Sequence, residues 1–318
     1  MKVYVSCFII FFFFLTPFYA KELPTEKSFL QRYFEALDTQ AQPLGNAFLW
    51  VVDGADTLFS VNREEVETLG RSHATIRFSG SKSEGESTLF GIKLKAHVSL
   101  PKTKDRLKLV FSSDSSDDYV KEQTRSNPKE VVENQDYLLG LRFFRPQEGI
   151  FKYYFQGGVK LHSPIDPYVR FVMSYEPQWF EPWDFLAKNV VSYFYHQKLQ
   201  TKTSVIWTKE LWPKWFVSHY DAFYYDKEEE RYETVHAITI EHALRAKQRI
   251  GLDLSAHLVD NETKEYGLDY YNIRLGNQKQ ITDAFSVEAV PSFILEKDED
   301  FEPKASFRLN LLYKIGRY

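Results

Sequence analysis

The chain has 318 residues, of which 40 are Lys or Arg and 44 are Asp or Glu, so its net charge at pH 7 is −4. This balance provides no general basic field and argues against nucleic acid as a partner. Cys7 is the one cysteine, which excludes an internal disulfide and a cysteine-ligated metal. Aromatic residues make up 17% of the chain, yet the mean hydropathy of −0.41 is that of a soluble protein. A transmembrane β-barrel combines these two properties, because alternate residues face lipid and water.

Residues 1–20 have the pattern of a signal peptide. Lys2 precedes an apolar run from Val3 to Leu15, and Ala20 is a suitable cleavage site. The apolar run is shorter than the ~20 residues that a transmembrane helix needs, although an uncleaved anchor is the alternative. The sequence therefore predicts export and cleavage near Ala20.

Residues 21–70 differ in composition from the rest and are predicted to form an N-terminal periplasmic segment. Phe29, Tyr33, Phe34 and Leu37 recur with helical spacing behind Thr25, which is a possible N-cap. We expect a short helical segment that packs beneath or into the mouth of the barrel. A mobile tail is the alternative.

Residues 71–318 alternate between apolar and polar side chains in short runs. In the run 87–100, Phe90, Ile92 and Leu94 share one face and Lys93 and Lys95 share the other. The runs are 72–80, 87–100, 105–113, 136–145, 149–162, 167–175, 188–197, 200–209, 214–225, 232–244, 247–259, 265–274, 282–295 and 304–317. Several approach the ~9–11 residues of a tilted membrane strand. We predict an all-β fold, namely a transmembrane antiparallel up-and-down β-barrel of about 14 strands, within a range of about 12–16.

The connections between these runs support a barrel in the bacterial outer membrane. If the first strand runs outward, the outer links include the longest one, 112–135, and most of the acidic runs. Most links on the other side are as short as the one from Pro101 to Lys104, as expected of periplasmic turns. A longer aromatic link from Glu181 to Lys188 is the exception.

The end of the chain indicates how the barrel is assembled. Phe307, Leu309 and Leu311 alternate toward the terminal aromatic residue Tyr318. Such a strand resembles the signal that the barrel assembly machinery reads. We therefore expect that machinery, outer-membrane lipid and lipopolysaccharide as partners of a monomeric barrel, and no nucleic acid.

Several segments resemble a family of uncharacterised proteobacterial outer-membrane β-barrel proteins. They are the segment from Asn46 to Gly54, the pair Arg77-Phe78, the segment from Phe285 to Phe293 and the segment from Pro303 to Leu309. The resemblance implies an outer-membrane barrel in a Gram-negative bacterium. It implies no established activity, so no functional residue is carried over.

Polar side chains opposite the apolar rows predict an uneven lumen. The predicted lumen-facing residues are basic in the first six strands and mostly acidic later: Arg77, Lys93, Lys95, His97, Arg106, Lys108, Arg142, Lys152, Lys160, Arg170, Asp221, Glu233, Glu241, Asp253, Asp269, Glu288 and Arg308. Such a pair of walls would set up a transverse field that orients dipolar solutes in a pore. The sequence therefore predicts a passive pore for small polar solutes with a charge-segregated lumen.

Two other functions stay open at this point. The same charges could pair with one another and close the lumen, which would make a non-conducting structural or interaction barrel. A lipid-modifying enzyme is the third possibility, but no His-x-Ser-Asn segment is present to supply a base and a nucleophile. His236 and His242 are expected on the opposite face from Glu241, so no metal cluster is predicted there. We expect no enzymatic activity, no cofactor and no metal.

Overall fold

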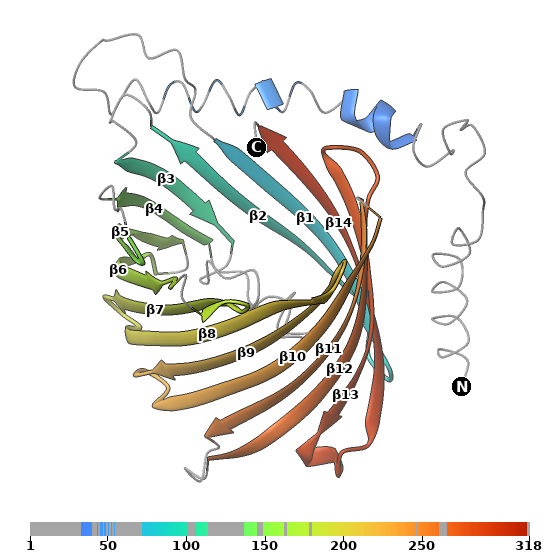
Figure 1. Cartoon of the computed structure of the whole chain (residues 1–318). Coiled ribbons are helices and arrows are strands. Elements are labelled where there is room, and N and C mark those ends of the chain that lie inside the picture. The colour runs from blue at the N-terminus through green and yellow to red at the C-terminus, as the bar shows by residue number, and fades with distance from the viewer. Residues whose placement is uncertain are drawn as a thin grey trace.

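A closed β-barrel makes up most of the computed structural model, which describes residues 33–39, single positions between 43 and 54, and residues 72–100, 106–113, 137–144, 149–161, 164–177, 180–245, 247–260 and 266–316. Within these residues, fourteen antiparallel strands pair in sequence order, and β1 closes the ring by pairing with β14 (Figure 1). The predicted fold class and strand number are thus confirmed. The predicted signal peptide, the cleavage site and Tyr318 lie outside the described residues.

The strand boundaries follow the predicted runs closely. They are β1 (His73–Ser83), β2 (Leu89–Ser99), β3 (Leu107–Ser112), β4 (Tyr137–Phe144), β5 (Phe151–Leu161), β6 (Asp166–Tyr175), β7 (Asp184–Phe194), β8 (Lys198–Trp212), β9 (Trp215–Asp226), β10 (Arg231–Arg245), β11 (Gln248–Asp260), β12 (Tyr266–Gln280), β13 (Phe285–Glu296) and β14 (Pro303–Gly316). A short 3-10 helix, η4 (Lys297–Glu299), lies between β13 and β14. We call the rim where β1 begins and β14 ends the terminal rim, and the opposite rim the loop rim.

Two boundaries differ from the prediction by more than three residues. β7 begins at Asp184, so most of the expected link from Glu181 to Lys188 is strand, and the Phe185 ring packs on Trp207 at 4.4 Å. β12 continues to Gln280, beyond the predicted run 265–274, because the residues after Arg274 still pair with β11 and, from Asn277 on, with β13. Neither extension shows clean alternation, so the sequence pattern ends before the hydrogen-bonded ladder does.

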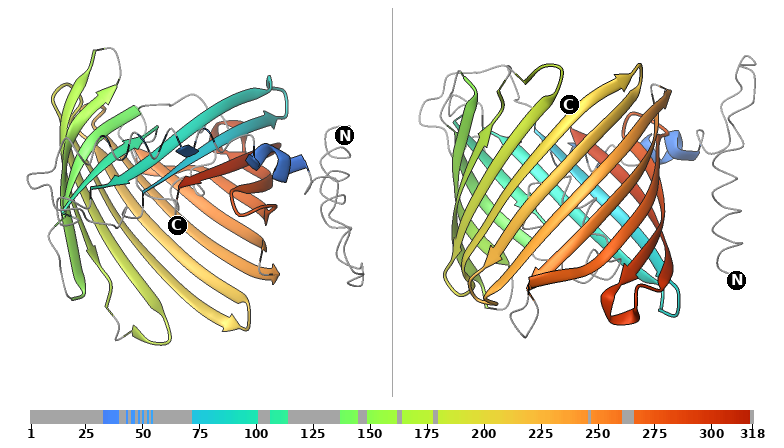
Figure 2. Two further views of the ribbon diagram at one scale, coloured as in Figure 1. Left: turned by 90° about the horizontal axis from the view of Figure 1, so that it is seen from above. Right: turned by 60° about the horizontal axis from the view of Figure 1, so that its bottom comes forward.

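The two faces of the wall have opposite character. The outward face carries large apolar side chains such as Phe90, Ile92, Val169 and Ile238, which are all about half exposed or more. The inward face between them is polar and charged. A closed ring leaves no unpaired strand edge in lipid, and an apolar outward face matches a hydrocarbon layer. Figure 2 shows the tilted, curved strands of this ring, which is a transmembrane barrel of the outer-membrane type.

The N-terminal helical residues 33–39 lie outside the ring of strands (Figure 2). Phe34, Leu37 and Phe48 pack against a buried cluster that contains Phe285 and Tyr313, both on the outward face near the terminal rim. The Phe34 and Phe285 rings are 5.3 Å apart. The helical segment was predicted correctly, but these contacts place it against the outer wall rather than in the barrel mouth.

No helix among the residues that the structure describes is both long and apolar enough to cross a membrane. The helical residues 33–39 amount to two turns, far short of the ~20 residues that a membrane span requires.

A glycine pair on the inward face makes room for an aromatic ring. Gly140 of β4 and Gly158 of β5 are cross-strand neighbours, and Tyr168 of β6 pairs with Gly158 on the other side. A Cβ on Gly158 would lie 2.1 Å from the Leu139 carbonyl oxygen. The side chain therefore has to be absent for β4 and β5 to approach.

Replacing Gly158 with alanine is expected to lower the free energy of unfolding by about 1–3 kcal/mol, because the added methyl group overlaps backbone that has to shift. Guanidinium-induced unfolding of the barrel in lipid vesicles measures this change. The matched control is Gly157→Ala on the same strand, where no atom lies within 4 Å of the new Cβ and the stability should hardly change. Equal stability of the two variants would contradict the close approach.

Candidate functional site: the charged lumen

The inward face of β1–β6 carries a row of basic side chains, which we call the basic wall. Its members are Arg77, Lys93, Lys95, Lys108, Arg142, Lys152, Lys160 and Arg170. Like charges are direct cross-strand neighbours at two points, Arg77 with Lys93 and Lys108 with Arg142. Such neighbours repel one another, so the wall is not arranged as a ladder of alternating charge.

Two further residues of the predicted basic row lie toward the terminal rim. His97 faces inward from β2, and its ring stacks on that of His73 at 5.1 Å. Arg106 is exposed one residue before β3, and its carbonyl oxygen accepts a hydrogen bond from the backbone N–H of Phe144. The predicted basic residues thus share one side of the barrel.

Neutral groups hold the cations in the middle of the basic wall. The Arg142 guanidinium donates two hydrogen bonds of 3.1 and 3.0 Å to Gln156 Oε1, and its centre lies 4.2 Å from the centre of the Tyr154 ring. Arg170 donates to Ser192 Oγ at 2.9 Å. Such hydrogen bonds and cation–π contacts orient a positive charge.

Carboxylates on this side of the barrel lie near the rims. Among the inward-facing residues that the structure describes on β1–β9, they are Asp166, Asp184, Glu210 and Asp226, each within three residues of a strand end. Asp166 accepts backbone hydrogen bonds from His196 and Gln197 and so fixes the β7–β8 turn. On the described strands, the middle of this wall therefore carries basic side chains and no inward-facing carboxylate.

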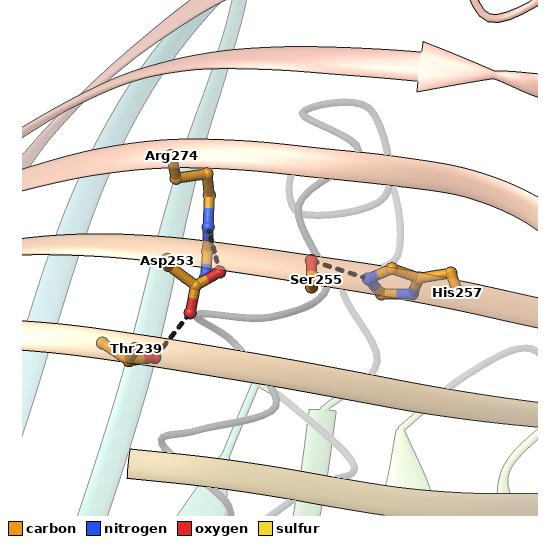
Figure 3. Close-up of polar contacts among 5 residues, drawn as sticks. All are labelled: Thr239, Asp253, Ser255, His257 and Arg274. Carbon is orange, nitrogen blue, oxygen red and sulfur yellow. Dashed lines mark hydrogen bonds and ion pairs between the residues drawn. The ribbon is translucent and has the colours of Figure 1, made fainter. Parts of the chain in front are cut away.

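The inward face of β10–β14, here the mixed wall, pairs its charges. Asp253 Oδ1 accepts hydrogen bonds from Arg274 at 3.2 and 2.8 Å, and Asp253 Oδ2 accepts one from Thr239 at 2.8 Å (Figure 3). Both members of this ion pair are buried. Arg249 and Glu241 form a more exposed ion pair of 3.3 Å.

Two other predicted acidic residues, Glu233 and Glu288, also lie on this wall. Glu233 faces inward and is buried, and Glu288 accepts a hydrogen bond from Asn310 at 2.7 Å. Arg308 faces inward from β14 and is buried as well. A cavity of ≈ 70 Å³ opens on this wall beside Asp253, Glu288 and Arg308. Its lining is mixed in charge, in contrast to the basic wall.

Asp221 is not in the lumen, which corrects the prediction for this residue. It pairs with His236 and Val205 on the outward face of β9, whereas Tyr220 and Ala222 face inward and are buried. Both faces of β9 mix polar and aromatic residues, so alternation of hydropathy could not decide between them.

Asp269 sits at an irregularity of β12 rather than in the regular ladder. His257 pairs with Tyr270, but the next residue, Leu258, pairs with Leu268, so Asp269 is the extra residue of a β-bulge. It is exposed toward the loop rim. A bulge shifts the alternation by one residue, and Tyr270, Asn272 and Arg274 therefore face inward.

Sequence reasoning missed several inward residues. Arg274 was missed because the bulge inverts the alternation of β12. Arg249 lies on the same face of β11 as Asp253 but was left out of the predicted set. Lys188 and Lys202 extend the basic wall onto β7 and β8. A periodicity analysis that allows a one-residue insertion would have found Arg274.

The histidines make no metal centre in the part of the chain that the structure describes, where no group of three or more potential ligands is placed to hold an ion. His257 is fully buried on the inward face, stacks on Tyr270 at 4.1 Å and lies 3.4 Å from Ser255 Oγ (Figure 3). It belongs to the polar packing of the mixed wall.

Solved structures similar to this one are outer-membrane barrels. A loop L8 deletion mutant of OmpT, an outer membrane protein of Vibrio cholerae, matches with a TM-score of 0.45 and 9% identity over 76% of this chain and 98% of its own. The outer membrane channel DcaP of Acinetobacter baumannii matches with a TM-score of 0.44 and 8% identity over 77% and 96%. These values are too low for an inference about function.

No protein-family model and no curated protein sequence matches the chain. Membership of the proteobacterial family that its segments resemble therefore stays a prediction.

Proposed function

We propose that this protein is a passive outer-membrane pore for small polar solutes and that it favours anions. The supporting observation is the basic wall, where like charges are cross-strand neighbours and the described carboxylates lie near the rims. A structural plug would gain from alternating charges, whereas a positive wall beside water concentrates anions. The proposal includes no catalytic activity and no cofactor.

The mixed wall lies across the barrel from the basic wall, so the electric field between the two walls has a direction. Glu233, Glu241, Asp253 and Glu288 lie on strands opposite the basic wall, although Arg249, Arg274 and Arg308 balance part of their charge. A dipolar solute would turn its negative end toward β1–β6. In this proposal the barrel spans the outer membrane, contacts lipid and lipopolysaccharide, and is inserted by the barrel assembly machinery.

A non-conducting barrel is the second candidate, and one observation favours it. Arg142, Lys160, Arg170 and Lys202 are only 5–7% exposed, so these members of the basic wall do not border open water. Lys93, Lys95 and Lys152 are more exposed on the same side. A pore would therefore be narrow at the level of the buried cations and wider elsewhere.

Solute flux into proteoliposomes tests the proposed pore. Vesicles that contain the refolded full chain are diluted into isosmotic solutions of small anionic, neutral and cationic solutes of similar size, and their swelling is followed by light scattering. The proposal predicts swelling that is fastest for the anionic solute, with protein-free vesicles as the control. Vesicles that do not swell in any solution would favour the non-conducting barrel.

A further inference from the structure

Asp221 and its neighbours form an ionisable cluster on the outside of the barrel. Asp221 Oδ1 lies 2.6 Å from His236 Nδ1 and 3.4 Å from His219 Nε2. The three side chains are between 35% and 51% exposed. β9 and β10, which carry them, lie side by side (Figure 1). The cluster therefore faces the hydrocarbon layer, where neutral apolar side chains are expected.

The cluster lies near the middle of the membrane span. Outward cross-strand pairs of β9 and β10 run from the terminal rim to the loop rim as Trp215–His242, Val217–Ile240, His219–Ile238, Asp221–His236, Phe223–Thr234 and Tyr225–Tyr232. The first and last pairs are stacked aromatic rings, with centroids 4.3 and 4.8 Å apart. Aromatic girdles mark the two interfaces of a membrane barrel. The ionisable groups occupy the third and fourth of six pairs, midway between these stacks.

Further polar groups adjoin the cluster on the same face. Asn189 of β7 donates a hydrogen bond of 2.8 Å to Thr203 of β8, and Thr203 pairs with Phe223, next to Asp221 on the outward row. Ionisable residues at membrane depth usually meet a protein partner, a water-filled cavity or one another. Here they meet one another, but their exposed edges still face outward.

We propose that this outward patch of β7–β10 is the interface with a second copy of this chain. The patch contains an acceptor, the Asp221 carboxylate, and donors on both sides of it, the His219 and His236 rings. A two-fold axis through the patch would bring the histidines of one protomer to Asp221 of the other, so the surface is complementary to itself. Val205 and Ala256, which adjoin the cluster on the outward face, are small and would let the barrels of two protomers approach closely.

This interface goes beyond the proposed pore and revises the expectation of a monomer. Polar groups drive association in lipid because their alternative is exposure to hydrocarbon. In contrast, the outward face of β2 carries Phe90 and Ile92, apolar and highly exposed, and suits lipid.

Site-directed cross-linking in native membranes tests the interface. Cys7 is the only cysteine, so a Cys7→Ser background has no thiol. In that background we expect Val205→Cys to give a cross-linked dimer with a short bismaleimide, and Ile92→Cys, across the barrel, to give little. Adding Asp221→Asn to Val205→Cys should weaken association about three- to ten-fold. Asp283→Asn, which removes a 95% exposed carboxylate from a turn, should not.

Folding and the identity of the partner are controlled in the same experiment. Heat-modifiable mobility on gels shows whether each variant is a folded barrel, and mass spectrometry shows whether the product contains two copies of this chain. Equal cross-linking from Val205→Cys and Ile92→Cys, no dimer from either, or a product with a different protein would overturn the proposal. So would a dimer yield that Asp221→Asn leaves unchanged.

Discussion

Replacing Asp253 with alanine is expected to lower the free energy of unfolding by about 3–5 kcal/mol. The side chains of Asp253 and Arg274 are only 10% and 5% exposed, and Thr239 donates to the same carboxylate. Removal of the carboxylate leaves a buried guanidinium without its anion, and that loss exceeds the net value of the pair itself. Equilibrium unfolding in guanidinium chloride, with the barrel in lipid vesicles, measures the change.

The matched control for Asp253 lies on the same wall. Glu241 pairs with Arg249 at 3.3 Å, and their side chains are 36% and 66% exposed. Water screens this pair, so Glu241→Ala should lower the stability by about 0–1 kcal/mol. If both variants lose the same stability, burial of the Asp253–Arg274 pair does not determine its contribution.

Reversing two charges of the basic wall is expected to change the ion selectivity of the proposed pore. In Lys93→Glu/Lys95→Glu, two charges change sign, so the charge on one side of the lumen changes by four units. One charge about 7 Å from an ion in water changes the energy of that ion by roughly 0.6 kcal/mol. After screening by salt, the ratio of anion to cation permeability should fall about ten-fold. The reversal potential under a salt gradient reports this ratio.

A control variant separates lumen charge from overall charge. Lys227→Glu/Lys297→Glu makes the same change of net charge in exposed turns at the loop rim. Its permeability ratio should change less than about two-fold, because these charges lie in exposed segments at the loop rim and are screened by salt. If the two double variants behave alike, the basic wall is not the selective element.

The strands could be predicted from the sequence because the alternation of apolar and polar residues reports which side chains face lipid and which face the lumen. In β2, the apolar Phe90 and Ile92 and the basic Lys93 and Lys95 separate cleanly, and the structure places them on opposite faces. The same holds for most of the first six strands. A barrel in lipid has to keep this separation, so the pattern is strong wherever the lumen is charged.

The errors in the predicted lumen-facing residues have specific structural causes. On β9, Asp221 lies outward while Tyr220 and Tyr224 lie inward, so polarity does not identify the lumen side of that strand. On β12, the bulge at Asp269 inverts the alternation and conceals Arg274. Both features depend on pairing with neighbouring strands, which a single run of sequence does not report.

For the N-terminal segment, the sequence predicted the helix but not the surface against which it packs. The spacing of Phe34 and Leu37 predicted a helix with an apolar side, and that helix is present. An apolar side does not specify its partner surface, however. The cluster with Phe285 and Tyr313 forms because those outward side chains lie near the terminal rim, beside the segment that precedes β1.

Ion conductance of the full chain in a planar lipid bilayer tests the proposed pore most directly. We expect discrete current steps and, under a potassium chloride gradient, a reversal potential that indicates preference for chloride, because the described inward charges in the middle of β1–β9 are basic. A variant without residues 21–70 should conduct equally, since the described part of that segment packs outside the barrel. Absence of current from both proteins, in bilayers where their insertion is verified, would contradict the proposed pore.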